Sequence, residues 1–223
     1  MRISCLTHDA IDTVNGEVTV LGTNNQTTYL DIINSMNDYQ ENLIVCNDGY
    51  DKLSVDDAID WVGDVMSNKI NFTAYINQFI KNFIKNLTED EINSLHAANN
   101  QIYRIVQEQL FMADLPLKVT FSNDLLNIFK YAKIHVDSSN FTNPYDIIRI
   151  LIKLHLECNN NKVLGLTNVA HYLSPKQIRD LVDLCHNTGI AVFIVEFMNL
   201  NQRHLFEKCN FHYIDEDFID WHY

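Results

Sequence analysis

The sequence contains no hydrophobic run long enough to cross a bilayer, although apolar residues make up 47% of its 223 residues. Its first residues, Met1–Cys5, include polar side chains where a signal peptide needs a continuous apolar stretch. We therefore expect a cytoplasmic protein with no membrane partner. The apolar content is also too high for a disordered chain and is typical of one sizeable folded core.

Cysteine occurs in no pattern that would bind a metal ion or build a disulfide framework. The cysteines number 5, an odd count, and no two of them stand at the spacing of zinc ligands. They are Cys5, Cys46, Cys158, Cys185 and Cys209. Most lie in apolar stretches, so we expect reduced thiols in the core.

Basic residues are scarce as well. Lys and Arg number 16 against 29 Asp and Glu, which gives a formal net charge of −13. This balance argues against nucleic acid as a partner and favours a protein-interaction role. It does not exclude DNA, because phosphate groups respond to the local arrangement of Lys and Arg, and a ring can be acidic outside and basic within.

Two stretches are nevertheless poor in acidic residues and carry lysines. Residues 65–88 contain no Asp or Glu, and residues 115–134 contain only Asp124. Their lysines are Lys69, Lys81, Lys85, Lys118, Lys130 and Lys133. Both stretches fit either solvated faces of amphipathic helices or a DNA-binding surface. Because lysine ammonium groups are point charges, such DNA binding would be independent of sequence and sensitive to salt.

The segment from residue 1 to residue 53 shows strand patterns around one helix. Arg2–Leu6 and Glu17–Leu21 have strand composition, and Asn15-Gly16 between them is typical of a hairpin turn. Asn42–Cys46 is an apolar run of strand length. Residues 28–39 have apolar side chains at helical spacing.

Residues 54–114 contain no proline and only Gly63, which favours long helices. Ser54 resembles the N-cap of a helix that continues through Met66. A second helix is expected over residues 72–87. Thr88 begins a capping box that opens a third helix reaching residue 112. We expect these helices to form an antiparallel arm.

The remaining residues return to alternating strands and helices. The expected elements are a helix over 125–132, a strand over 134–136, a helix over 144–158, a strand over 162–166, a helix over 175–187 and a strand over 190–195. Ser174 and Gly189 suit the two caps of the last helix. The last three elements form a βαβ unit with parallel strands, which indicates an α/β head interrupted by the helical arm.

The turn after Glu17–Leu21 occupies the place of a phosphate-binding loop but lacks its chemistry. Residues 22–28 contain neither a second glycine nor the lysine that meets the β- and γ-phosphates, so a divergent NTPase is only an alternative. The 9 histidines form no His-Glu-x-x-His motif. Acidic residues at 56–60 and 215–217 are interpreted as helix caps and a solvated tail. We expect no catalytic residues.

The C-terminal half carries a pattern known from one family. It runs through Lys162–Asn168, Tyr172–Ile178 and Ile190–Glu196: a strand ending in Asn, then Leu-Ser-x-x-Gln, a helix, and an apolar strand ending in Glu. Ile214–Phe218 and Asp12–Leu21 match the closing segment and the opening strand. In these features the chain resembles the accessory spacer-acquisition protein of type II-A CRISPR systems, the Csn-two family.

The resemblance implies an α/β head like a degenerate phosphate-loop ATPase, with an inserted α-helical leg. It also implies a homotetrameric ring that takes double-stranded DNA ends through its central hole and has no enzymatic activity. The implied partners are the CRISPR integrase complex and the RNA-guided effector nuclease, in the adaptation step of antiviral defence.

Calcium is the cofactor that the resemblance implies. The family's ligands are acidic residues near the junction of leg and head, where this chain retains Glu108 and Asp114, with Asp124 further on and Lys118 interposed. Calcium takes about six to eight oxygen ligands, usually with several carboxylates, so a site here would depend on backbone carbonyls and water. Whether calcium binding is retained stays open.

These observations predict a head made of residues 1–57 and 115–223 and a leg made of residues 58–114. They predict a non-enzymatic ring that binds DNA ends during CRISPR spacer acquisition. The alternatives are an acidic protein-interaction scaffold that does not bind DNA, favoured by the net charge, and a divergent NTPase.

Overall fold

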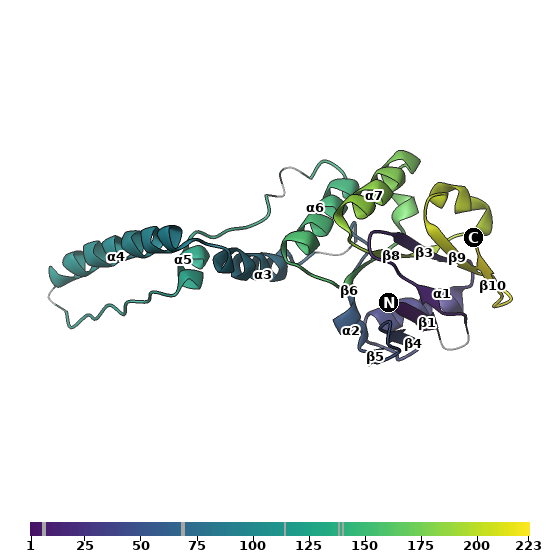
Figure 1. Cartoon of the computed structure of the whole chain (residues 1–223), viewed down its shortest axis with the longest axis horizontal. Helices are drawn as coiled ribbons and strands as arrows, with labels where there is room; N and C mark the ends of the chain where they lie inside the picture. Colours follow the sequence, from purple (N-terminus) through teal and green to yellow (C-terminus); the bar gives the residue numbers. More distant parts are fainter. Residues whose placement is uncertain (6–7, 68–69, 114, 138, 140) are drawn as a thin grey trace. The chain divides into compact units, whose positions relative to one another are not determined.

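The structure is a computed structural model that describes residues 1–5, 8–67, 70–113, 115–137, 139 and 141–223. Its internal contacts divide the chain into two compact units. Met1–Ile70 and Ser138–Tyr223 form the head, and Asn71–Asp137 form the helical unit (Figure 1). These boundaries differ from the expected ones at residues 58 and 114, because residues 59–63 form a strand of the head and residues 115–137 pack within the helical unit.

A six-stranded sheet forms the centre of the head, in the order β10-β9-β3-β8-β7-β6. From β9 to β6 each neighbouring pair is parallel, and β10 runs antiparallel to β9. The strands are β3 (Val18–Thr23), β6 (Ile59–Gly63), β7 (Val163–Thr167), β8 (Val192–Phe197), β9 (Asn210–Ile214) and β10 (Asp220–His222). The partly parallel α/β sheet expected from the sequence is confirmed.

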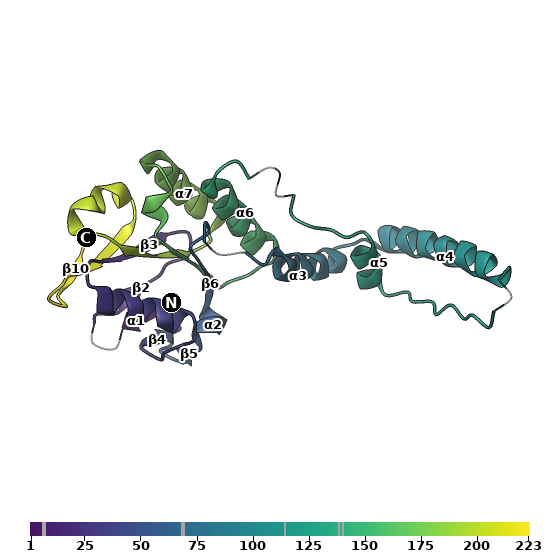
Figure 2. The ribbon, with the colours of Figure 1, turned by 180° about the vertical axis from the view of Figure 1, so that it is seen from behind.

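The two faces of this sheet are covered by different layers. Helices α6 (Pro144–Glu157) and α7 (Pro175–Thr188) lie on one face, and α1 (Gln26–Met36) with a smaller sheet lies on the other (Figure 1, Figure 2). Side chains alternate across a strand, so β8 sends Phe193 and Val195 into the core shared with α1. Burying each such side chain contributes about 1.5–3 kcal/mol, which makes the central strands a main source of stability.

The βαβ unit predicted from residues 162–195 is confirmed. Strands β7 and β8 pair in parallel, and α7 connects them. The Ser174 side chain and Gln177 form the expected capping box at the start of α7. Gly189 ends the helix with φ of 72°, a conformation that a residue with a Cβ rarely adopts.

A smaller antiparallel sheet, in the order β2-β1-β4-β5, corrects the predicted hairpin of residues 2–6 with residues 17–21. Its strands are β1 (Arg2–Cys5), β2 (Ile11–Asp12), β4 (Leu43–Cys46) and β5 (Lys52–Leu53). β1 pairs with β2 and β4, whereas β3 is buried along its whole length and pairs with β8 and β9. The strong burial of β3 in the central sheet outweighs the local turn signal at Asn15-Gly16.

The helix predicted from Ser54 through Met66 is also wrong in extent. Ser54 does cap a helix, but this helix, α2, covers only Val55–Ala58, and Ile59–Gly63 continues as β6 beside β7. The Trp61 ring packs over Gly165 of β7: a Cβ built at Gly165 would stand 2.5 Å from the Trp61 ring. Pairing with β7 therefore overrides the helical spacing of apolar residues.

The helical unit contains α3 (Phe72–Lys85), α4 (Glu89–Phe111) and α5 (Leu125–Tyr131). The predicted capping box at Thr88 is present at the start of α4. α5 contacts both longer helices, with the Phe83 and Phe129 rings 5.7 Å apart. The strand expected over residues 134–136 is absent, because these residues have no strand partner and follow α5 as an irregular segment.

The cysteines are free thiols, as the sequence predicted. Cys158 and Cys185 are buried, and burial raises the pKa of Cys185 and of the partly buried Cys209 to about 12. Two short 3₁₀ segments, Val169–His171 and Leu200–Phe206, complete the head. Within the described ranges, each helix is either too short or too polar to cross a bilayer.

The contact between Trp61 and Gly165 gives a stability test. Gly165→Ala should lower the free energy of unfolding by about 1–3 kcal/mol, because the added methyl overlaps the Trp61 ring and Ile59. Urea unfolding measures this change. Gly49→Ala, at an exposed turn, should change it by less than about 0.5 kcal/mol, and Trp61→Leu combined with Gly165→Ala should recover part of the loss. Equal effects at residues 165 and 49 would contradict the packing.

Candidate nucleic-acid interface

Three polar side chains follow one face of α3 at intervals of four residues. They are Asn77, Lys81 and Lys85, and all three are exposed. Residues four apart are neighbours on a helix surface, so the amide and the two ammonium groups form a row. The helix buries Ile76 and Ile80, and this packing holds the row at the surface.

The lysines near α5 adjoin the same row. Lys130 lies in the last turn of α5, and Lys133 follows it in a turn with φ of 52°. Asn77, Lys130 and Lys133 line a single cavity of about 270 Å³ whose floor is apolar. Because Asn77 belongs to both features, the α3 row and the α5 lysines form one surface, which we call the lysine surface.

The other two predicted lysines lie elsewhere. Lys118 is exposed in the segment between α4 and α5 and does not line this cavity. Lys69 falls outside the described residues. The lysine surface is therefore made of Asn77, Lys81, Lys85, Lys130 and Lys133.

The lysine surface has no carboxylate partners within the described ranges. None of its four lysines, nor Lys118, lies within ion-pair distance of an acidic side chain there. Exposed ammonium groups without counter-charges break no ion pair when they turn toward phosphate oxygens. The surface is therefore free to bind an anion.

The acidic charge of the chain is concentrated in the head. Residues 71–137 hold 6 Lys and Arg against 7 Asp and Glu, whereas the head holds the other 10 basic and 22 acidic residues. The helical unit thus carries a net charge of −1 and the head −12 of the total −13. A nucleic acid would meet far less repulsion at the helical unit than at the head.

Of the three predicted calcium ligands, the structure describes Glu108 and Asp124. Glu108 is an exposed residue of α4, and Asp124 caps α5 by accepting a hydrogen bond from the N–H of Leu126 at 3.0 Å. Asp114 lies outside the described residues, and among those that the structure describes no three His, Cys, Asp or Glu side chains form a possible metal site. Glu108 and Asp124 alone fall short of the carboxylates that calcium prefers.

The acidic C-terminal residues also have structural roles. The Asp215 carboxylate accepts hydrogen bonds from the N–H groups of Asp217 and Ile219 and from the Trp221 indole, which holds the turn between β9 and β10. These bonds lower the pKa of Asp215. Its oxygens are engaged inside the turn rather than available to a cation.

The turn after β3, where a phosphate loop would lie, leads into α1, and the Asn25 side chain caps this helix. The Asn25 side-chain oxygen accepts hydrogen bonds from the N–H groups of Thr27 and Thr28, at 2.9 and 3.2 Å. An anion at the start of α1 would need those same N–H groups. The Asn25 side chain therefore competes with any anion for the first N–H groups of α1.

Sequence reasoning missed a polar network at the carboxyl ends of β7 and β8. Asn168 donates a hydrogen bond to the Tyr29 hydroxyl at 2.7 Å and accepts one from the N–H of Phe197 at 3.2 Å. The Tyr29 hydroxyl is 3.2 Å from the Thr167 hydroxyl. Polar residues at the ends of two neighbouring parallel strands were the signal that could have revealed it.

Next to this polar network, the pKa of Glu196 is shifted strongly from its ordinary value. Its side chain is fully buried in β8, and one oxygen accepts a hydrogen bond from the N–H of Ala170 at 3.1 Å. Burial raises its pKa from 4.5 to about 8, against the lowering effect of that hydrogen bond. Among the described residues its other oxygen has no hydrogen-bond partner. Glu196 is therefore mainly protonated at neutral pH.

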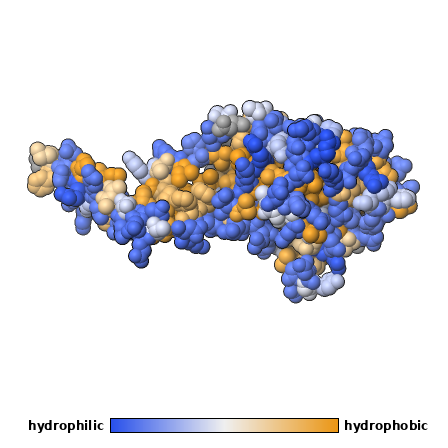
Figure 3. Space-filling model, turned by 45° about the horizontal axis from the view of Figure 1, so that its top comes forward, coloured by the Kyte–Doolittle hydropathy of each residue, from blue (hydrophilic) through white to orange (hydrophobic). Residues whose placement is uncertain are grey.

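The longest helix described, α4, leaves part of its apolar stripe exposed. None of its residues is buried, and Ile102, Ile105 and Val106 are 43–51% exposed. Just beyond the helix, Met112 is 83% exposed. Figure 3 shows apolar side chains among the polar ones on the visible face of the helical unit. Apolar surface of this extent is typical of a protein-binding site.

Comparisons with known proteins give one family. The family model of a CRISPR-associated protein (Cas_Csn2) matches residues 36–218, which is more than half of the chain. A search among curated proteins finds no match.

Among solved structures, Stu0660 of Streptococcus thermophilus has a TM-score of 0.50 and 11% sequence identity, covering 100% of this chain and 76% of that chain. At this identity the likeness supports the fold alone. An ABC transporter ATP-binding protein from Pyrococcus furiosus has a TM-score of 0.39 and 10% identity, covering 97% of this chain and 94% of that chain.

The Glu196 environment predicts a pH dependence of stability. The folded state keeps the Glu196 proton between pH 4.5 and about 8, where the unfolded chain has lost it. Stability should therefore fall as pH rises through this range, by at most about 1.4 kcal/mol per pH unit from this group. Glu196→Gln, which mimics the protonated acid, should remove this part of the slope in urea unfolding. The exposed Glu207→Gln variant should keep it. Identical slopes in all three proteins would contradict a protonated Glu196.

Proposed function

The chain belongs to the family of CRISPR-associated Csn2 proteins, which act in CRISPR adaptation, and on this premise we propose that it binds the ends of double-stranded DNA during spacer acquisition. The observation that carries the proposal is the lysine surface. Its ammonium groups are exposed, lack acidic partners within the described residues and lie in the least acidic part of the chain.

Binding through this surface would depend on charge and not on sequence. Lysine lacks the planar fork with which arginine reads base edges, so Lys81, Lys85, Lys130 and Lys133 would contact phosphate oxygens. The amide of Asn77 adds a neutral donor to the same surface. Each phosphate contact releases condensed cations, so affinity falls as salt rises. The acidic head would keep the duplex on the helical unit.

We further propose a homotetrameric ring of the type II-A system, in the cytoplasm. The uncovered apolar stripe of α4 supports self-association, because burying it against another copy removes apolar area from water. A ring explains how an acidic protein binds DNA ends: the duplex enters a basic hole and avoids the acidic outer surface. The CRISPR integrase complex and the RNA-guided effector nuclease would be its partners.

The proposed role involves no catalysis. The Asn25 cap uses the N–H groups that a nucleotide phosphate would need, which disfavours the NTPase alternative. The net charge of −12 on the head favours a second alternative, an acidic scaffold that binds proteins and no DNA. A titration with duplex DNA separates this alternative from the proposal.

The first functional prediction concerns DNA topology. Linear duplex should bind, covalently closed circular duplex of equal length should bind far more weakly, and raising salt from about 50 mM to about 200 mM should weaken binding at least tenfold. Mobility-shift or anisotropy titrations, with calcium and with a chelator, measure this. Equal binding to linear and circular DNA would contradict an end-threading ring. No binding to either form at low salt would contradict the proposal and favour the alternative function as an acidic scaffold.

The second functional prediction locates the contact. Lys81→Glu combined with Lys85→Glu should weaken duplex binding roughly tenfold or more and reduce the salt slope by about 0.9 for each lost phosphate contact. Lys176→Glu is the matched control, because Lys176 is exposed on α7 of the head and pairs with Asp180. Light scattering should give the same mass for all variants. Unchanged binding in the double variant would rule out α3 as the main contact.

A further inference from the structure

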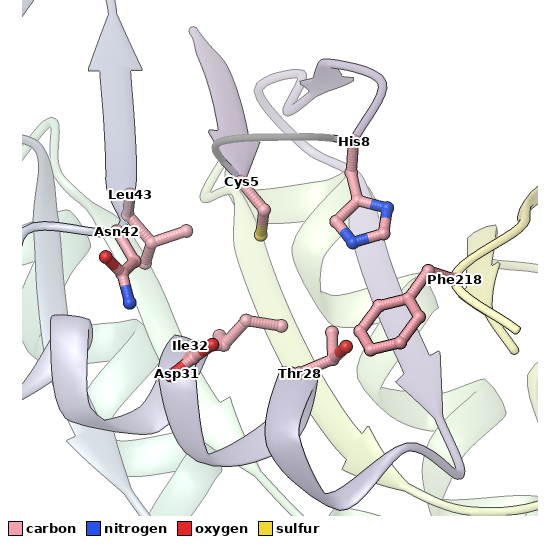
Figure 4. A pocket seen from close by; sticks show the side chains of 8 residues that line it. All are labelled: Cys5, His8, Thr28, Asp31, Ile32, Asn42, Leu43 and Phe218. Atoms are coloured by element: carbon pink, nitrogen blue, oxygen red, sulfur yellow. The ribbon is translucent and has the colours of Figure 1, made fainter. Parts of the chain in front are cut away.

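The head contains a cavity of about 210 Å³ on the side of α1 that faces the small sheet (Figure 4). Four segments that are distant in sequence line it: the end of β1 with His8, α1, the start of β4, and the turn between β9 and β10. The lining residues are Cys5, His8, Thr28, Asp31, Ile32, Asn42, Leu43 and Phe218. The cavity is separate from the lysine surface, which belongs to the helical unit.

One buried hydroxyl in this cavity lacks a hydrogen-bond partner. Thr28 is only 5% exposed, and among the described residues its side-chain oxygen has no donor or acceptor. Its backbone N–H is already bonded to Asn25, so the hydroxyl is the group left to satisfy. Buried polar atoms are nearly always paired, so this oxygen is available to hydrogen-bond a ligand in the cavity.

The charge in the cavity is negative. Asp31 is half-buried in the wall and makes no ion pair within the described ranges. Its carboxylate and that of Asp220 both raise the pKa of Cys5, to about 12 together with the larger effect of burial. Among the lining residues that the structure describes there is no Lys or Arg. A positively charged ligand in the cavity would offset the negative charge of Asp31.

His8 adds a polar group to the wall of the cavity. Its Nδ1 is 2.8 Å from the Asp220 carboxylate, which accepts a hydrogen bond from it. In the tautomer that donates from Nδ1, the Nε2 atom is left as an acceptor. Phe218 stacks on the His8 ring with centroids 6.4 Å apart and, with Ile32 and Leu43, gives the cavity apolar walls.

We propose that this cavity binds a small organic cation, an ammonium or guanidinium group on a short apolar body. The cation would face the Asp31 carboxylate and the Thr28 hydroxyl, and the apolar body would lie against Ile32, Leu43 and the Phe218 ring. Aromatic faces attract cations, which adds to the attraction of Asp31. An anion is disfavoured by Asp31. A metal ion is disfavoured because the Cys5 thiol stays protonated and the described residues offer no group of three ligands.

Butylammonium and its neutral analogue 1-butanol test the proposal on the full-length protein. In amide NMR titrations, butylammonium should bind saturably and shift the Thr28, Asp31 and Asn42 signals. Butanol should bind at least tenfold more weakly, since it lacks the charge. Asp31→Asn should weaken butylammonium binding about ten- to hundredfold, the usual range for losing a hydrogen bond to a charged group. Asp38→Asn, just beyond the end of α1 and outside the cavity, is the control.

Thr28→Val, which keeps the side-chain volume and removes the hydroxyl, should weaken binding about two- to tenfold. Equal affinity for butylammonium and butanol would overturn the proposal, as would undiminished binding by a folded Asp31→Asn variant or the absence of saturable shifts at the cavity amides. If Asp31→Asn fails to fold, comparing butylammonium with butanol on the unsubstituted protein still tests whether the cavity prefers a cation. The test is independent of DNA binding, so its failure leaves the proposed function unaffected.

Discussion

The structure depends on the parallel pairing of β3 with β8 and β9. All residues of β3 are buried, and the strand joins the N-terminal part of the head to a C-terminal part that begins after the helical unit. This pairing closes the head across an insertion of residues 71–137. Once the head is closed, the cost of lengthening the insertion grows only slowly with its length. The helical unit can therefore differ from the head in charge and in exposed apolar surface without unfolding it.

Because the helical unit can differ from the head in charge, one acidic chain can carry a surface rich in lysine. The head folds with its excess of carboxylates because most of them are solvated, and the helical unit bears Lys81, Lys85, Lys130 and Lys133 with few acids around them. The same unit leaves the apolar stripe of α4 exposed, which a separate soluble domain would avoid. Within the helical unit, exposed lysines and exposed apolar side chains therefore occur together.

The sequence predicted those elements whose signals are local. Capping boxes at Thr88 and Ser174 and the glycine at residue 189 fixed helix ends correctly, because each acts within one turn. The expected hairpin at Asn15-Gly16 and the expected helix over residues 59–63 failed, because strand pairing with distant segments decided both. The cavity beside α1 was not predictable, since its walls come from four distant segments.

The usual ligand site of a parallel α/β sheet is occupied by the protein itself. Asn25 caps α1, Asn168 and Tyr29 bond one another, and Glu196 is buried in its protonated form at the same edge of the sheet. Unpaired polar groups would cost free energy, and the internal bonds of Asn25, Asn168 and Tyr29 satisfy these side chains without a ligand. The topology of this sheet rests instead on β3 and β8, which are buried in the core. Fold alone therefore does not give function here.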